Sequence, residues 1–323
     1  MRFPVNLLLL CILLLHGCGL KTDKAVLSFQ HADDGTQAAD IAANGKVSVV
    51  SSIDLGLLVW DLEYDQKIYQ WGVGGEGANL ISNVRIAFDS SYVVSSDRDS
   101  FALWNLQNGE PEGFWRIDES TIRDVAVADQ GVGILVGRGN GTVLFFEPFS
   151  GRRLEFLGHQ EKINSVDISP NGRYALTGSN DYVAYLWDTQ SGQVIYRFDH
   201  PTRVTKVAID PKGRYLFTAD SQKAARIWDV QTGKEVSNLS FIQRQKIFTA
   251  VEFSDDGSKL LTGSPNRHLS MWDVATGELL ESWRVKPNEH AIGKSAIVYA
   301  VGFYNEGQVI SESSSGWAEV WDL

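Results

Sequence analysis

The stretch of residues 158–188, GHQEKINSVDISPNGRYALTGSNDYVAYLWD, decides the fold predicted for this chain. Apolar and polar residues alternate over residues 163–168, and a Pro-Asn-Gly turn follows at 170–172. A second strand begins at Tyr174, and a third ends at Trp187-Asp188 after a polar turn. Period-two alternation interrupted by turn residues is typical of a small antiparallel sheet. One such sheet cannot bury both of its faces, so copies of it must stack.

The copies are marked by the Trp-Asp pair that ends the third strand. The mark recurs, once as Trp-Asn and once as Phe-Glu, at intervals of 41 to 49 residues: Trp60-Asp61, Trp104-Asn105, Phe146-Glu147, Trp187-Asp188, Trp228-Asp229, Trp272-Asp273 and Trp321-Asp322. With Gly-His at the other end of the unit, the pattern resembles the WD40 repeat, whose units are four-stranded blades of a β-propeller. The resemblance covers essentially everything after residue 24 and implies an all-β, seven-bladed propeller.

The ring is expected to close through the N-terminal strand. Residues 25–31, AVLSFQH, resemble residues 153–159 and 194–200, which are the outer fourth strands of their units. The seventh unit has no fourth strand after Trp321-Asp322. We therefore expect residues 25–30 to complete the last blade beside residues 318–321, as in WD40 proteins, which removes the free sheet edges.

The sequence is predicted to divide into three segments: a lipoprotein signal peptide at residues 1–17, a lipidated tether at 18–24, and a propeller at 25–323. A propeller of that length leaves no room for a separate catalytic domain. A hydrophobic content of 43% indicates a packed globular chain. The formal charge of -11 disfavours a nucleic-acid partner. We expect a monomeric propeller.

The N-terminus carries the signal for export. A short apolar run covers residues 7–15, too short to span a bilayer comfortably, and Leu15-His16-Gly17-Cys18 resembles the bacterial lipobox. That resemblance implies cleavage before Cys18 and acylation of its side chain and new N-terminus. Gly19 in place of the Asp that retains lipoproteins in the inner membrane favours the outer membrane, facing the periplasm. The alternatives are an ordinary signal peptide or a free cysteine.

The WD40 resemblance also implies a structural hydrogen-bond network. In that family a His, a Ser or Thr, an Asp six residues before the Trp, and the Trp itself interact within a blade. All four match only at His159, Thr177, Asp181 and Trp187; for example, Gln222 stands where the next blade would need the Asp. We therefore expect the complete network in that blade alone.

Motifs for catalysis and cofactor binding do not fit their structural context. Residues 72–77, GVGGEG, match the letters of a dinucleotide fingerprint but join two strands, so we expect a loop. Ile292-Gly293-Lys294-Ser295 lacks the first glycine of a phosphate-binding loop, because Asn288 stands there. The histidines lack metal-ligand spacing, and there is no Gly-x-Ser-x-Gly motif. The sequence thus predicts no cofactor, no metal site and no enzyme activity.

A group of basic residues is the candidate binding site. In WD40 propellers the turns between second and third strands share one face with the loops that join blades. These segments carry Arg98, Arg138, Lys223, Arg267, His268 and Lys294. A basic collar on an acidic body would attract an anionic partner, although turns are polar in any protein and these charges are also explained as solvated ones.

The function indicated is that of a lipid-anchored scaffold of the bacterial cell envelope, which binds a protein or peptide through its loop-bearing face. The alternative is an envelope enzyme or small-ligand sensor that uses the mouth of the propeller channel. That alternative requires carboxylates or histidines clustered around the channel, and the sequence offers no convergent set.

Overall fold

The computed structural model describes residues 24–72, 80–241, 247–288 and 295–323. The segments that carry Cys18, most of the glycine run 72–77, and Lys294 lie outside the described residues. Among those described, no helix is long and apolar enough to cross a bilayer.

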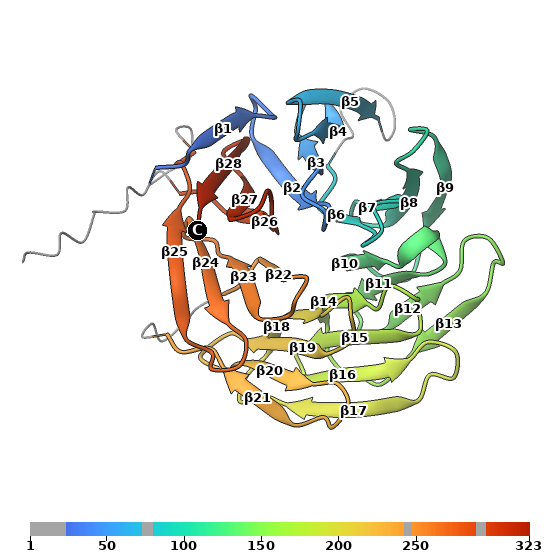
Figure 1. The fold of residues 1–323 in the computed structure, drawn as a ribbon. Coiled ribbons are helices and arrows are strands. Elements are labelled where there is room, and N and C mark those ends of the chain that lie inside the picture. Colours follow the sequence, from blue (N-terminus) through green and yellow to red (C-terminus); the bar gives the residue numbers. More distant parts are fainter. Residues whose placement is uncertain (1–23, 73–79, 242–246, 289–294) are drawn as a thin grey trace, which may run out of the picture.

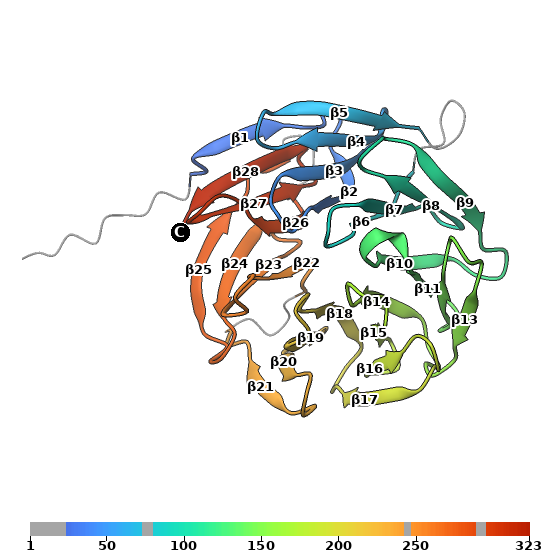
Figure 2. The same cartoon turned by 45° about the vertical axis from the view of Figure 1, so that its right-hand side comes forward.

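The described strands form seven four-stranded antiparallel sheets arranged as a closed ring (Figures 1 and 2). The fold class predicted from the repeats is therefore confirmed. We number the sheets as blades 1–7 along the chain and count the strands of each blade from the channel outward.

Blades 1 to 4 follow one another without crossovers. Blade 1 consists of β2 (Thr36–Ile41), β3 (Val47–Ser52), β4 (Gly56–Asp61) and β5 (Gln66–Trp71). Blade 2 consists of β6 (Asn83–Ile86), β7 (Tyr92–Ser96), β8 (Ser100–Asn105) and β9 (Pro111–Arg116). Blade 3 consists of β10 (Ile122–Val127), β11 (Ile134–Arg138), β12 (Val143–Phe146) and β13 (Arg153–Phe156), with the short 3-10 helix η1 (Asp129–Gly131) after its first strand. Blade 4 consists of β14 (Ile163–Ile168), β15 (Tyr174–Ser179), β16 (Val183–Asp188) and β17 (Val194–Asp199).

Blades 5 to 7 complete the circle. Blade 5 consists of β18 (Val204–Ile209), β19 (Tyr215–Asp220), β20 (Ala225–Asp229) and β21 (Glu235–Asn238). Blade 6 consists of β22 (Ala250–Phe253), β23 (Lys259–Gly263), β24 (His268–Asp273) and β25 (Leu279–Arg284). Blade 7 consists of β26 (Val298–Phe303), β27 (Gln308–Ser313), β28 (Trp317–Asp322) and the N-terminal β1 (Leu27–Gln30).

The two ends of the described chain meet in blade 7, as the sequence predicted. Strand β1 pairs antiparallel with β28, with Leu27 opposite Val320 and Gln30 opposite Trp317. Figure 1 shows β1 in blue against the red C-terminal strands. This pairing leaves no blade of the ring with a missing outer strand.

The hydrophobic core lies between blades. Each of the seven buried clusters contains residues of two neighbouring blades, so each sheet buries its apolar faces against the sheets beside it. In blade 3, Phe146 replaces the Trp of the repeat and is equally buried, in the cluster shared with blade 2. The sheets therefore stabilise one another around the whole circle, which is why single repeats cannot fold alone.

Residues within each turn determine the backbone conformation of that turn. The Asp of the Trp-Asp mark accepts backbone hydrogen bonds in the turn that follows, as where Asp188 accepts from Gln190 and Ser191, both at 2.9 Å. The turn after the first strand needs a left-handed residue, which is Gly172 in blade 4 with φ of 70°. At this turn in blade 1, a Cβ on Gly45 would stand 2.5 Å from the backbone oxygen of Phe303, so the seam also requires glycine there.

Candidate functional site

The strand order divides the loops between two faces of the ring. In an antiparallel blade, the turns after the first and third strands lie at one end, and the turn after the second strand and the loop to the next blade lie at the other. We call the first the hairpin face and the second the loop face. The basic residues singled out in the sequence belong to the loop face.

The structure distributes these basic residues over several blades. Arg98 and Lys223 are exposed, but they belong to blades 2 and 5, which are not neighbours. Arg138 is only 5% exposed and forms an ion pair with Glu155 at 2.9 Å. A buried, paired guanidinium cannot meet a partner in solution without first breaking that pair.

Two further members of the predicted collar lie at the start of β24. Arg267 is half-buried and donates two hydrogen bonds, at 2.9 and 2.6 Å, to the backbone oxygen of Val285. His268 is also half-buried. Lys294 lies outside the described residues. The basic residues predicted as a binding site therefore lie on several blades of the loop face, and their side chains differ in solvent exposure.

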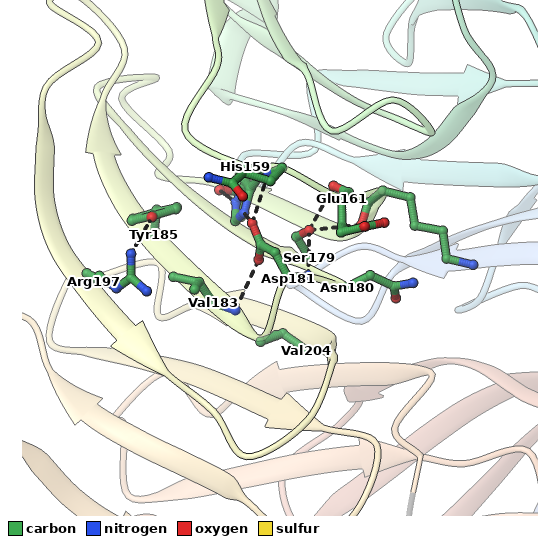
Figure 3. Close-up of polar contacts among 12 residues, drawn as sticks. His159, Glu161, Ser179, Asn180, Asp181, Val183, Tyr185, Arg197 and Val204 are labelled. Atoms are coloured by element: carbon green, nitrogen blue, oxygen red, sulfur yellow. Dashed lines mark hydrogen bonds and ion pairs between the residues drawn. The ribbon is translucent and has the colours of Figure 1, made fainter.

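The network expected around His159 is present in part (Figure 3). His159 Nδ1 lies 2.9 Å from Asp181. The Nε2 of His159 lies 2.9 Å from Thr177 Oγ1. Burial opposes ionisation of Asp181, but the hydrogen bond and charge of His159 outweigh it and lower the pKa of Asp181. Trp187 is fully buried, yet its indole Nε1 has no hydrogen-bond partner among the described residues. The prediction was thus right for three residues and wrong for Trp187.

Blade 5 holds a chain of the same kind that the sequence analysis did not predict. His200 Nε2 lies 2.9 Å from Thr218 Oγ1, which accepts from Trp228 Nε1 at 2.8 Å. Asp220, not residue 222, lies nearest the other ring nitrogen, at 3.9 Å. The signal was available, because these three residues follow their counterparts in blade 4 at a constant interval of 41.

Both networks fasten the loop that enters a blade to the strands of that blade. Asp181 also accepts from the backbone of Gln160 and of Val183, each at 3.1 Å, so it connects the incoming loop to the turn of its own blade. The side chains at these positions are committed to each other. Their arrangement attaches the two loops that enter blades 4 and 5 to the strands of those blades.

The channel carries charged residues that the sequence analysis missed. Figure 1 shows the first strands β2, β6, β10, β14, β18, β22 and β26 around the centre of the ring. The middle residue of each apolar-x-apolar triplet in these strands faces inward, and it is charged in four blades: Asp40, Arg85, Asp167 and Glu252. Asp124 and Lys206 stand two residues earlier in β10 and β18, where Ala126 and Ala208 occupy the middle position. The expectation that no set of carboxylates converges on the channel was therefore wrong.

Three of the carboxylates connect neighbouring blades. Asp40 accepts from the backbone nitrogen of Ile86 at 2.8 Å, and Asp167 accepts from that of Ile209 at 2.7 Å. Asp124 does the same for Val166 at 3.0 Å. Each bond satisfies a donor on the next blade, so these side chains hold the inner strands together.

The remaining channel charges are less well compensated. Burial disfavours the charged form of Arg85, but Asp124, Asp40 and Asp167 outweigh it and raise the pKa of Arg85. Burial, followed by the charges of Asp40 and Asp167, raises the pKa of Glu252 to about 8. Among the described residues, Glu252 has no hydrogen-bond or ion-pair partner. It is therefore the carboxyl group of the channel that is open to an additional ligand.

Glu252 lines two connected cavities at the hairpin face. A channel cavity of about 90 Å³ also contacts Asp40, Arg85 and Asp167. A wider cavity of about 480 Å³, which we call the mouth pocket, lies at the entrance. The mouth pocket is lined by Phe88, Phe253 and Phe303 and by residues of the first turns of blades 1, 2, 5 and 6. Its size is that of a small-molecule site.

Metal chemistry has no candidate centre in the part of the chain that the structure describes. No group of three or more His, Cys, Asp or Glu side chains there is arranged to hold a metal ion. Three of the channel carboxylates, Asp40, Asp124 and Asp167, instead accept backbone hydrogen bonds.

Comparison with known proteins identifies the repeats. The WD40 family model (WD domain, G-beta repeat) matches residues 151–188, 192–229 and 238–273, which run from the outer strand of blade 3 to the third strand of blade 6. The chain is also 28% identical over 156 residues to the WD repeat-containing protein SL1-17 of Schistosoma mansoni. That match covers 46% of this chain and 49% of the relative, so the chain spans about half the length of the curated protein it resembles.

Proposed function

We propose, from WD40 repeats built into a closed seven-bladed ring, that this chain is a non-enzymatic interaction module that binds a protein or peptide through its loop face. WD40 propellers typically bind protein partners, and a fold by itself does not name the partner. The observation that supports the loop face is the pair of histidine networks, at His159 and His200. They hold successive loops in fixed positions, and fixed loops lower the entropy cost of binding.

Site-specific photo-crosslinking in the native envelope tests this proposal. A photoreactive amino acid at Arg98 or Lys223 probes the loop face, and one at Lys212 or Glu306 probes the hairpin face. We expect a discrete protein adduct from the loop-face positions, and we expect that same adduct to be absent from the matched hairpin-face positions. Adducts from the hairpin face alone would contradict the proposal.

We further propose that the module is a bacterial lipoprotein, attached through Cys18 and facing the periplasm at the outer membrane. The apolar run 7–15 and the sequence Leu15-His16-Gly17-Cys18 support this. Strand β1 starts at Leu27, so only a few residues separate Cys18 from the ring, and the propeller would lie close to the bilayer. Two or more acyl chains are needed for stable anchoring, since each buried CH2 contributes about 0.8 kcal/mol.

Mass spectrometry of the mature N-terminus tests the anchor. We expect a diacylglyceryl and an acyl group on Cys18, and membrane release with retained signal peptide for Cys18→Ser. Cleavage at another residue, or an unmodified Cys18 in the membrane fraction, would rule out the lipoprotein form.

The second candidate function is ligand sensing at the mouth of the channel. The observation in its favour is the mouth pocket of about 480 Å³ above the channel charges. A thermal-shift screen separates the two functions, because a ligand at 100 times its dissociation constant adds about 2.7 kcal/mol to stability.

A further inference from the structure

The mouth pocket combines an apolar wall with a negative base. Phe88, Phe253 and Phe303 come from blades 2, 6 and 7, on different sides of the channel. Phe88 keeps 39% of its surface exposed, although it is a large apolar side chain beside a cavity. Such a wall favours the alkyl or aromatic body of a ligand.

Four of the five charged residues at the rim of the pocket form ion pairs. Asp210 binds Arg214 through two hydrogen bonds, at 2.6 and 2.8 Å. Lys212 lies 2.8 Å from Asp255. The charges cancel within each pair. The remaining rim carboxylate, Asp89, accepts hydrogen bonds from the backbone nitrogens of Ser91 and Gln130.

The base of the pocket is different, because its charges do not cancel. The channel contains four carboxyl groups, Asp40, Asp124, Asp167 and Glu252, against two basic groups, Arg85 and Lys206. Arg85 interacts electrostatically with all four carboxyl groups, but among the described residues its ion pair is with Asp40, at 4.0 Å, and not with Glu252. Lys206 does not line either cavity. Glu252 is the member of this acidic group that lines both the channel cavity and the mouth pocket.

A second orphan group lies on the pocket wall. Ser90 Oγ is buried and has no hydrogen-bond partner within the described residues. Ser90 holds the left-handed position of its turn, with φ of 59°, where most blades have glycine. A buried hydroxyl without a partner costs free energy, and a ligand that carries a donor would satisfy it.

We propose that the mouth pocket binds an organic cation, with its ammonium or guanidinium group at Glu252 and its apolar chain against Phe88, Phe253 and Phe303. The same chemistry is offered by a lysine or arginine side chain of a peptide and by a free polyamine. This proposal deepens the second candidate function and is independent of the lipid anchor and of the loop-face partner. Glu252 is the recognition group, and the aromatic wall selects for a hydrocarbon chain.

Binding of a cation should be coupled to proton release. Burial and the charges of Asp40, Asp167 and Asp210 outweigh the opposing charge of Arg85 and raise the pKa of Glu252 to about 8, so this carboxyl is mostly protonated at pH 7. A bound cation favours the ionised form, and affinity should therefore rise between pH 7 and pH 9. Lys206, whose pKa burial lowers to about 8, loses its charge over the same interval and acts in the same direction. Removal of Glu252 separates the two contributions.

Calorimetric titration of butylguanidinium into the full chain in detergent tests the proposal, because this probe keeps its charge throughout that pH range. We expect saturable binding that tightens with pH, and no binding of the neutral isostere butylurea. Glu252→Gln should weaken binding at least tenfold and remove most of the pH dependence. Phe88→Ala, at a partly exposed position, should weaken binding several-fold without loss of the fold.

Glu306→Gln is the matched control, because it removes the same charge from an exposed turn on the same face. We expect that variant to bind like the wild type. Unsaturable binding by the wild type, or equal affinity for folded Glu252→Gln, would overturn the proposal. Capture of a loop-face partner by Glu252→Gln should be unchanged in either case. Failure of the cation-binding proposal can therefore be distinguished from failure of the loop-face proposal.

A second titration distinguishes the source of the cation. A short peptide with one arginine is compared with its citrulline counterpart and with agmatine. Preference for the arginine peptide assigns the pocket to a protein side chain, and preference for agmatine assigns it to a free amine. Equal binding of the citrulline peptide would contradict recognition of a charge.

Discussion

His31 Nδ1 lies 2.6 Å from Glu312 Oε1, although 281 residues separate the two in sequence. Both side chains are fully buried at the seam of the ring, and Ser48 of blade 1 donates to the same oxygen at 2.7 Å. His31 also stacks on Trp60, with ring centroids 4.5 Å apart. The seam is therefore held by a polar network as well as by the pairing of β1 with β28.

Breaking this pair should be costly. Glu312→Ala leaves a buried imidazole without its partner, and removal of one member of a buried pair costs about 3–5 kcal/mol. Urea denaturation of the variant should show a loss of that order. A variant as stable as the wild type would show that hydrophobic contacts alone close the ring.

The same pair predicts a pH dependence on the alkaline side. Burial disfavours charge on His31, but Glu312 and Asp65 outweigh it and raise the pKa of His31 above 6.5. The folded chain then binds a proton more tightly than the unfolded chain, so this contribution is complete below about pH 6.5 and is lost as the pH rises through the folded pKa. Glu312→Gln should flatten the corresponding slope in unfolding free energy, measured between pH 6 and pH 9.

His200 predicts the opposite behaviour on the acid side. Burial, followed by the charge of Arg226, lowers the pKa of His200 from 6.5 to about 4. The unfolded chain binds the proton more tightly here, so stability is complete above about pH 6.5 and falls as the pH drops toward 4. His200→Gln should have a shallower stability slope than the wild type over this interval. Equal slopes would mean that His200 does not titrate in this way.

Deletion of β1 should open the ring. Without residues 25–31, blade 7 keeps three strands and a free edge, and edges of that kind pair with other chains. We expect the deletion to unfold or oligomerise, as measured by light scattering and thermal melting. Removal of residues 1–24 retains β1 and is the control, expected to remain a monomer with the wild-type melting temperature. A monomeric, equally heat-stable deletion of 25–31 would contradict closure.

Gly316 should be more sensitive than other turn glycines. It has φ of 80°, and a Cβ there would stand 1.9 Å from the backbone oxygen of Ala32. Gly307 has a similar φ of 73° but nothing within 4 Å of its Cβ position. Gly307→Ala should cost about 1–2 kcal/mol for the left-handed backbone alone, and Gly316→Ala clearly more. Similar melting temperatures for the two variants would show that the seam relaxes around the added methyl group.

Charge reversal on the loop face should separate binding from stability. Arg98→Glu and Lys223→Glu alter exposed residues, so we expect reduced partner recovery in a pull-down with an unchanged melting temperature. Arg138→Glu instead places a second carboxylate beside Glu155 in a buried position, and should lower the melting temperature. Unchanged recovery with the first two variants would exclude them from the binding surface.

The sequence by itself determined the strands, the number of blades and the closure of the ring. Blades 1 to 6 are each one continuous stretch of chain, so the alternation, the turn residues and the Trp-Asp mark of a blade can be recognised within one segment of the sequence. Closure followed from the likeness of residues 25–31 to the outer strands elsewhere. The His159–Asp181 contact was also predictable, because both residues belong to one repeat.

Only the tertiary structure decided which polar groups meet across blades. Asp40, Arg85, Asp167 and Glu252 come from strands about 40 residues or more apart, and each appears in sequence as a lone charge in an apolar strand. The ring brings these side chains to one axis, where burial strengthens the interaction between their charges. Among the described residues, Glu252 is left there without a hydrogen-bond or ion-pair partner. The same ring geometry buries Arg138 and brings His31 into contact with Glu312. The distances between these side chains depend on the curvature of all seven blades, and the sequence of a single repeat does not determine that curvature.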